Sequence, residues 1–280
     1  MTDTSEHRAD AAPAEPGLSL NFECLPECGG CCQDLRLPLT IAEAIAWLER
    51  GGKVEMLCEA IPWESEPAPD QLVAAHKRRR SFPAQSGALP VRVIVVLAAR
   101  FEAGCPNLLP DMRCGIYHER PLVCRIYPAE INPFIELQPA HKMCPPHAWS
   151  STTPFIRGGQ IVDAQVAEDI ASSRAADQRE APFKAQVCEE LGVDIASFST
   201  LGFAVHHPER GALLAALQRV AAQAAAADMP IEDPAMLMPA WRFSSDRPDY
   251  AEALKSVGAE VAADGEASAG GAPWERLSLG

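Results

Sequence analysis

Eight cysteines in two short segments are the residues of this chain whose types and spacing could do chemistry. The first segment reads CLPECGGCC from Cys24, and the second extends from Cys105 to Cys144. Thiolates bind zinc and iron tightly, and two cysteines separated by two or three residues can direct both sulfurs at one ion from a single turn. Gly29 and Gly30 remove the side chains that would obstruct that turn. We therefore predict a metal site with the candidate ligands Cys24, Cys28, Cys31, Cys32, Cys105, Cys114, Cys124 and Cys144.

The eight candidate cysteines are compatible with several kinds of metal centre. Eight thiolates could hold one iron–sulfur cluster with ligands to spare, two zinc ions, or a single metal beside a redox-active pair. We favour an iron–sulfur cluster, for example 4Fe-4S, over zinc because eight soft ligands exceed what one zinc ion needs. The two remaining cysteines, Cys58 and Cys188, stand apart, and Cys188 falls on the apolar face of an expected helix.

Composition and charge limit the cellular compartment and the partners expected for this site. The chain has 280 residues and a net charge of −14, and it contains no apolar run of the ~18 residues that a membrane span needs. Its N-terminal residues lack the pattern of a secretory signal, so we expect a cytoplasmic protein in which dense cysteines hold metal rather than form disulfides. The acidic balance argues against attachment to a membrane or nucleic acid, and we interpret the basic run Lys77 to Arg80 as the solvated end of a helix.

The elements that must position the cysteines are few. Thr40 and Glu43 form a capping box at the start of a helix that ends before Gly51. We expect short strands at Leu18 to Glu23 and Val91 to Leu97, and prolines exclude long regular elements from the second cysteine segment. Further helices are expected at 71–80, from 162 to about 191, from 208 to about 227, and from 249 to about 263.

These elements predict an α+β fold that is mostly α. We expect a loop-rich cysteine-cluster domain followed by a helical C-terminal half. The predicted divisions are a disordered tail at 1–17, a metal-binding domain at 18–150, a helical region at 151–263 and a second disordered tail at 264–280.

The cysteine pattern resembles the YkgJ-type cysteine-cluster proteins, a family of zinc- or iron-chelating domains. The resemblance lies in CGGCC at 28–32 followed by the Thr40/Glu43 helix, in CPNL from Cys105, and above all in CGIYHERPLVCRIYP at 114–128. It covers about residues 22–148 and implies that ligation falls on the cysteines, so the neighbouring His118, His141 and His147 are left out of the ligand set.

The residues around Cys124 that take part in the resemblance have interpretable chemistry. Arg120 and Arg125 flank this cysteine and could offset the negative charge of a thiolate site, although each could equally pair with an acidic side chain. We expect Tyr117 and Tyr127 to pack around the site, and Pro121 and Pro128 to fix its turns.

The sequence predicts a metal-binding protein whose biochemical role and catalytic residues it does not assign. Most members of the resembling family have no assigned reaction. One alternative is an iron–sulfur-dependent protein-modifying enzyme similar to the flagellin lysine N-methylases, and another is a zinc thiol redox switch. The helical half could bind a protein partner, and the excess of arginine over lysine suits a bacterial origin.

Overall fold

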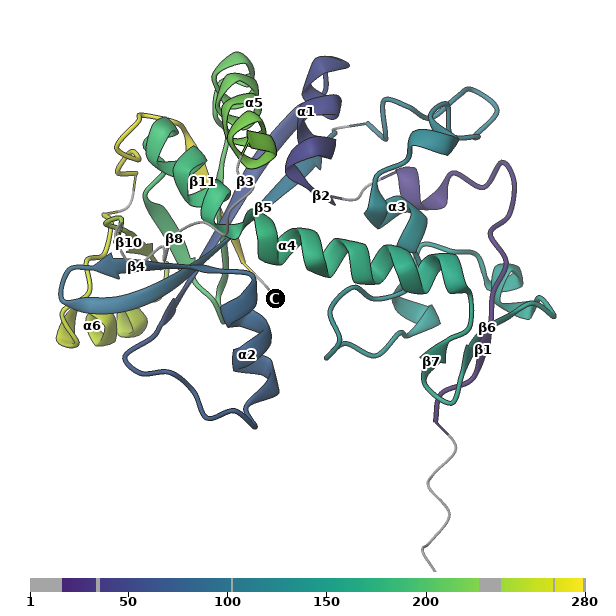
Figure 1. Cartoon of the computed structure of the whole chain (residues 1–280), viewed down its shortest axis with the longest axis horizontal. Coiled ribbons are helices and arrows are strands. Elements are labelled where there is room, and N and C mark those ends of the chain that lie inside the picture. The colour runs from purple at the N-terminus through teal and green to yellow at the C-terminus, as the bar shows by residue number, and fades with distance from the viewer. Residues whose placement is uncertain (1–16, 34–35, 102, 227–237, 264, 279–280) are drawn as a thin grey trace, which may run out of the picture.

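The computed structural model describes residues 17–33, 36–101, 103–226, 238–263 and 265–278, and it is organised around two long antiparallel strands. These strands, β3 (Lys53–Pro62) and β5 (Leu89–Arg100), pair continuously from Lys53 opposite Arg100 to Pro62 opposite Val91. They form the centre of an eight-stranded sheet (Figure 1). The other strands of this sheet are β2 (Leu37–Leu39), β4 (Phe82–Ser86), β8 (Ile195–Phe198), β9 (Gly202–His206), β10 (Arg242–Ser244) and β11 (Trp274–Ser278).

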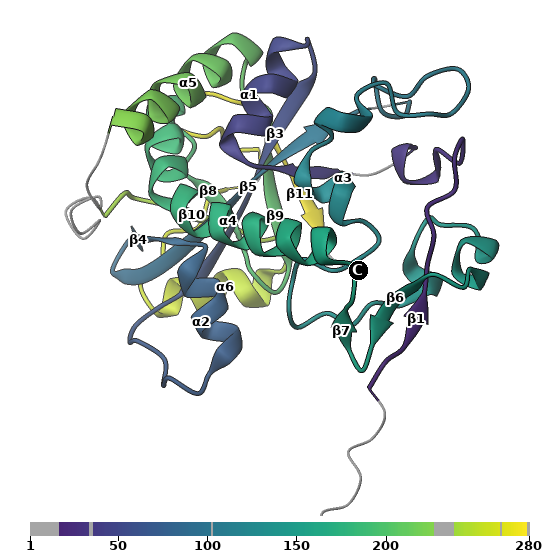
Figure 2. The same ribbon diagram turned by 45° about the vertical axis from the view of Figure 1, so that its right-hand side comes forward.

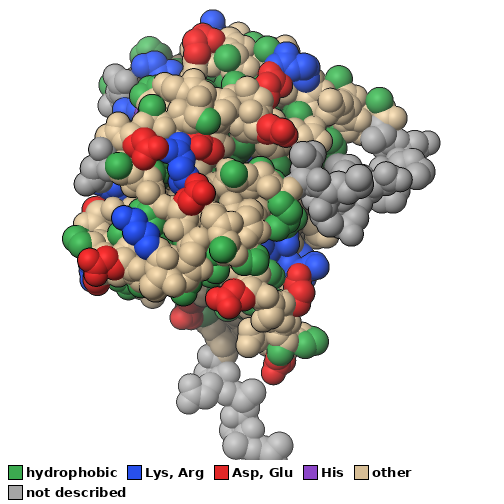
Figure 3. Space-filling view, turned by 90° about the vertical axis from the view of Figure 1, so that its left-hand side faces the viewer, with side chains coloured by type: hydrophobic (Ala, Val, Ile, Leu, Met, Phe, Trp, Pro, Cys, Tyr) green, Lys and Arg blue, Asp and Glu red, His purple; other side chains and the backbone are tan. Residues whose placement is uncertain are grey.

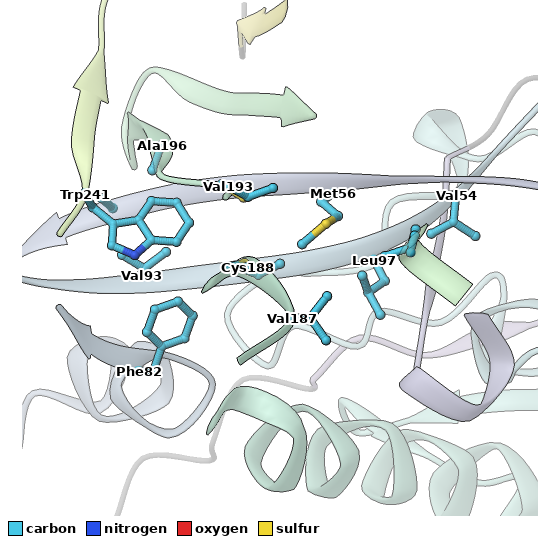
Figure 4. Packing of buried hydrophobic residues seen from close by; sticks show 14 of the residues in the cluster. Val54, Met56, Phe82, Val93, Leu97, Val187, Cys188, Val193, Ala196 and Trp241 are labelled. Atoms are coloured by element: carbon cyan, nitrogen blue, oxygen red, sulfur yellow. The ribbon is translucent and has the colours of Figure 1, made fainter. Parts of the chain in front are cut away.

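The alternating pattern of β3 and β5 decides which face of the sheet carries the main core. Even-numbered residues of β3 and odd-numbered residues of β5 are apolar and buried on one face, where Met56 lies opposite Leu97. Helices α1 (Ile41–Glu49) and α5 (Arg210–Ala226), with the C-terminal end of α4 (Ala164–Leu191), cover this face. Figure 4 shows Trp241, Phe82, Val187 and Cys188 packed against these strands.

A small lobe, which we define as residues 17–33 and 129–161, lies beside this body (Figure 1). Its three-stranded sheet has the order β1 (Leu20–Asn21), β6 (Pro154–Arg157), β7 (Gln160–Ile161). A second hydrophobic cluster fills the lobe and includes Phe22, Phe155 and Ile170. Because Ile170 belongs to α4, this long helix has its first turns in the lobe cluster and its last turns in the main core.

The remaining helices are short and lie at the edges. They are α2 (Leu72–Arg79), α3 (Leu122–Ile126) and α6 (Pro248–Ser256), together with the 3-10 turns η1 (Gly30–Cys32), η2 (Tyr117–Glu119), η3 (Pro139–His141) and η4 (Pro146–Ser150). The capping box expected at the start of α1 is confirmed, with Glu43 N donating to Thr40 Oγ1 at 3.2 Å.

The expectation of a mostly α fold with a helical C-terminal half is wrong. The protein is a mixed α/β fold, and its described residues form an eight-stranded and a three-stranded sheet. Four strands of the large sheet, β8 to β11, come from the C-terminal half. They are three to five residues long, and such short strands carry too little alternation to be recognised without the neighbours that complete their hydrogen bonds.

Two further expectations need correction in the same region. Trp274–Ser278, expected within a C-terminal tail, form β11 and pair with β9 from Trp274↔His206 to Ser278↔Gly202. The helix expected to continue to about residue 263 ends at Ser256. The predicted N-terminal tail lies outside the described residues except for Gly17.

One face of the body carries acidic and basic side chains interspersed (Figure 3). Among the described residues, no helix combines the length and the apolar character needed to cross a membrane.

Candidate metal centre

The eight predicted ligands line one cavity of about 1210 Å³. Cys24 is exposed, the other seven are half-buried, and all ten cysteines of the chain are free thiols. The cavity lies where the small lobe meets the body, since Cys144 packs against the lobe cluster while Cys105 and Cys124 pack against the main core. Folding thus brings together two cysteine groups that are far apart in the sequence.

Two glycines allow the first cysteine group to turn inside the cavity. Gly29 has a φ of 56°, a left-handed conformation that glycine adopts without strain, and it precedes η1. A Cβ on Gly30 would lie 2.8 Å from the carbonyl oxygen of Met143, the residue before Cys144. The sequence prediction that these glycines clear the turn is therefore supported by the packing around both of them.

Backbone hydrogen bonds align the second cysteine group with the first. Cys105 N donates to Cys32 O at 2.6 Å, which fixes these two cysteines side by side. A bridge between Leu108 and Cys114 then folds the 105–114 loop back on itself. As a result Cys114 reaches the same cavity through a tight turn and not through a long regular element.

Cys124 and Cys144 are held by α3 and by the tyrosine that follows it. Cys124 lies in the middle of α3. Met143 N donates to the hydroxyl of Tyr127 at 2.6 Å, and this hydroxyl also contacts the thiol of Cys144. Tyr127 therefore packs at the site with its hydroxyl occupied, as the sequence predicts.

The thiols influence one another electrostatically. The neighbouring Cys32 thiol lowers the pKa of Cys31 to about 7 and that of Cys105 to about 6, and these two neighbours raise the pKa of Cys32. Burial raises the pKa of Cys124 to about 12, and the nearby Cys31 and Cys105 act in the same direction. Thiolates crowded in this way repel one another, so a bound cation would favour ionisation of the whole set.

The two arginines around Cys124 have different surroundings. Burial raises the pKa of Cys24 and Cys124, whereas the Arg120 guanidinium acts in the opposite direction on both thiols. Arg120 Nε donates to Tyr117 O at 3.0 Å, and its guanidinium stacks 3.8 Å from the centre of the Tyr117 ring. Arg125 instead pairs with Asp169 of α4 at 3.2 Å.

Several residues near the cysteines do not join the cavity, and one that does was missed. Of the three histidines considered, His118 lines the cavity, whereas His141 and His147 are not among its lining residues. Asp169, which also lines the cavity, is buried, and it was not singled out from the sequence. The sequence gives no sign that this lone helical aspartate lines the cavity, because its pairing with Arg125 exists only in the folded protein.

The donor set fits a thiolate-bound metal, although the described sulfurs are not arranged around a single ion position. Within the part of the chain that the structure describes, no three His, Cys, Asp or Glu side chains are grouped tightly enough to hold an ion as they stand. Eight soft sulfur donors in one cavity, with an arginine beside them, match the chemistry of zinc and of iron–sulfur clusters. Cys58 and Cys188 are buried in the main core, outside this set.

A family model matches this same region. Residues 23–145 match the CxxCxxCC family, described as a putative zinc- or iron-chelating domain. The match confirms the resemblance found in the sequence, and residues 23–145 are similar to the members of that family. Comparisons with curated proteins and with solved structures found no match.

Proposed function

We propose that the eight cavity cysteines hold a metal–thiolate centre that joins the small lobe to the body. The observation that supports this proposal is the shared cavity, which receives thiols from both cysteine groups and from both hydrophobic cores. The first group follows strand β1 of the lobe, and Cys124 comes from α3, which packs on α4. A metal bound by both groups would cross-link these parts of the chain.

The centre would hold either an iron–sulfur cluster or zinc, and we favour the cluster. Eight thiols exceed the four that one zinc ion needs. When bound, such a cluster could transfer electrons or serve a purely structural role. The residues of this chain would supply the sulfurs, the turn at Gly29 and Gly30, and the positive charge of Arg120.

Metal analysis of protein purified without oxygen tests the identity of the centre. Brown colour with stoichiometric iron and acid-labile sulfide would support the cluster. A colourless protein with stoichiometric zinc would contradict the cluster and leave a zinc–thiolate centre. Binding of adenosylmethionine to the iron form would support the protein-modifying alternative, and its absence would argue against a methylase.

Substitution of single cysteines tests the ligand set. We expect Cys28→Ser and Cys124→Ser to lower bound metal and soluble yield together, because metal binding and folding are linked. The matched control is Cys188→Ser, whose side chain lies in the main core and should leave metal content and spectrum unchanged. A full metal complement in Cys28→Ser protein would contradict the assignment.

A redox role is the second candidate, and the contacts of Cys32 favour it. This thiol is hydrogen-bonded to both Cys31 and Cys105, so a pair of sulfurs suitable for oxidation lies inside the proposed zinc site. In that reaction hydrogen peroxide accepts two electrons from two thiolates and, with two protons, becomes two water molecules. The two sulfurs form a disulfide, and the metal that they bound is released. Zinc release in proportion to added peroxide would support this role, and retention of zinc would exclude it.

A further inference from the structure

One carboxylate group connects the start of α1 with the start of α3. The Oε2 atom of Glu43 accepts a hydrogen bond from Thr40 N at 2.9 Å, as a capping box requires. Its Oε1 atom accepts a second bond, from Leu122 N at 2.6 Å. Leu122 is the first residue of α3 and lies 79 residues further along the chain. The second contact has no role in capping α1.

The second contact caps the start of α3. Pro121 precedes this helix and provides no side-chain hydrogen bond to cap it. The five-residue helix is too short to be stable by itself, so its position depends on what holds its ends. Cys124 follows Leu122 by two residues, and the carboxylate of Glu43 therefore fixes the backbone immediately before a candidate ligand.

Glu43 can hold α3 in place because α1, which carries it, is itself firmly packed. Ala44, Trp47 and Leu48 of α1 are buried in the main core. Ile41 N donates to Glu180 Oε2 of α4 at 3.0 Å, which ties the start of α1 to the long helix. A rigid helix thus presents the Glu43 side chain, half-buried, to α3.

We infer that Glu43 is a positioning residue for the metal centre, holding Cys124 in place through α3 without touching the metal. This inference rests on the proposed function, because it takes Cys124 as a ligand. Groups that orient metal ligands from outside the coordination shell typically affect metal affinity about 10–100-fold. We expect a loss of that size when the carboxylate is removed while every cysteine is retained.

The experiment measures how fast the holoprotein releases its metal, zinc or iron, to a colorimetric chelator. Glu43→Ala should release metal about 10–100-fold faster than the unchanged protein. Glu43→Gln, which keeps one acceptor oxygen, should lie between them and provides a milder variant if Glu43→Ala folds poorly. The matched control is Thr40→Ala, which removes the α1 cap but keeps the carboxylate beside Leu122 N.

The outcomes separate the inference from the proposed function. Faster release in Glu43→Ala than in Thr40→Ala, with no further increase when Glu43→Ala is added to Cys124→Ser, supports positioning through Cys124. Equal release from the Glu43 and Thr40 variants, while Cys124→Ser releases metal quickly, overturns the inference and leaves the ligand set intact. Unchanged release from Cys124→Ser removes Cys124 from the ligand set and overturns the inference with it.

Discussion

At the scale of single residues, the cavity depends on small side chains as much as on cysteines. Gly29 adopts a left-handed backbone conformation, and Gly30 faces the backbone of the segment that carries Cys144. The first group can approach the Cys144 segment because no side chain projects from Gly30, and a Cβ on Gly29 would instead lie 2.6 Å from Cε of Met112. Close approach of two backbones is a general reason for glycine at a ligand-bearing turn.

Gly30→Ala should therefore weaken metal binding although it changes no ligand. The added Cβ would lie 2.8 Å from Met143 O, so the backbone of the turn or of the Cys144 segment would have to move. We expect at least a tenfold rise in the dissociation constant for the metal, measured by competition with a chelator.

Gly211→Ala is the matched control for this substitution. A Cβ on Gly211 would meet only the flexible side chain of Glu209, at 3.0 Å, near the start of α5. Alanine also has the higher helix propensity, so we expect unchanged metal affinity and equal or greater stability. Equal losses of metal affinity in the two variants would contradict the steric argument.

At the scale of elements, α4 connects the two hydrophobic cores and also holds α3. Asp169 of α4 has a side chain only 5% exposed and receives Arg125 Nη2 at 3.2 Å. Gln165 Nε2, one turn earlier in α4, donates to the same carboxylate at 3.3 Å. The helix that carries Cys124 is therefore attached to α4 by Arg125, near the opposite end from its contact with Glu43.

Asp169→Asn should destabilise the protein because it removes the charge that offsets Arg125. A hydrogen bond to a buried charged group contributes about 1–3 kcal/mol, and we expect a loss of that order in the free energy of unfolding by urea. The control is Asp249→Asn, which affects the exposed pair with Arg247 and should change stability by less than about 1 kcal/mol. Losses of the same size in both variants would show that the pair made by the buried Asp169 contributes no more to stability than the exposed pair.

At the scale of the whole molecule, the small lobe has much less paired backbone than the body, although α3 and α4 contribute side chains to its cluster. Strands β1 and β7 are two residues long, whereas β3 and β5 are paired over ten positions. The proposed metal would connect the N-terminal segment of the lobe with the second cysteine group. The stability of the lobe should therefore depend on metal much more than that of the body.

Removal of the metal should increase amide hydrogen exchange in the lobe and not in the central sheet. Peptides that contain the bonds from Phe22 N to Thr153 O and from Glu23 N to Ala148 O should lose protection, because local opening there no longer breaks metal–sulfur bonds. Peptides from β3 and β5 serve as the internal control. Equal changes in lobe and sheet, or no change in either, would contradict a metal that joins the lobe to the body. Exchange followed by mass spectrometry with and without chelator measures both.

The amino-acid sequence by itself determined the local features of this protein. It predicted the eight candidate ligands that the cavity brings together, the glycine turn at 29–30 and the capping box at Thr40 and Glu43, because each depends on spacing within a few residues. It also predicted the helices α1, α2, α4 and α5, whose apolar periodicity or capping signals are visible in one segment.

Only the tertiary structure decided the fold class and the arrangement of the site. The sequence does not predict β3, because the buried Glu55 interrupts its apolar residues. Strands β8 to β11 are defined by hydrogen bonds to strands far away in the sequence. The second contact of Glu43 and the pairing of Arg125 with Asp169 join segments 79 and 44 residues apart. Spacing along the chain cannot reveal such contacts, because they exist only when packing of the two cores has brought the segments together.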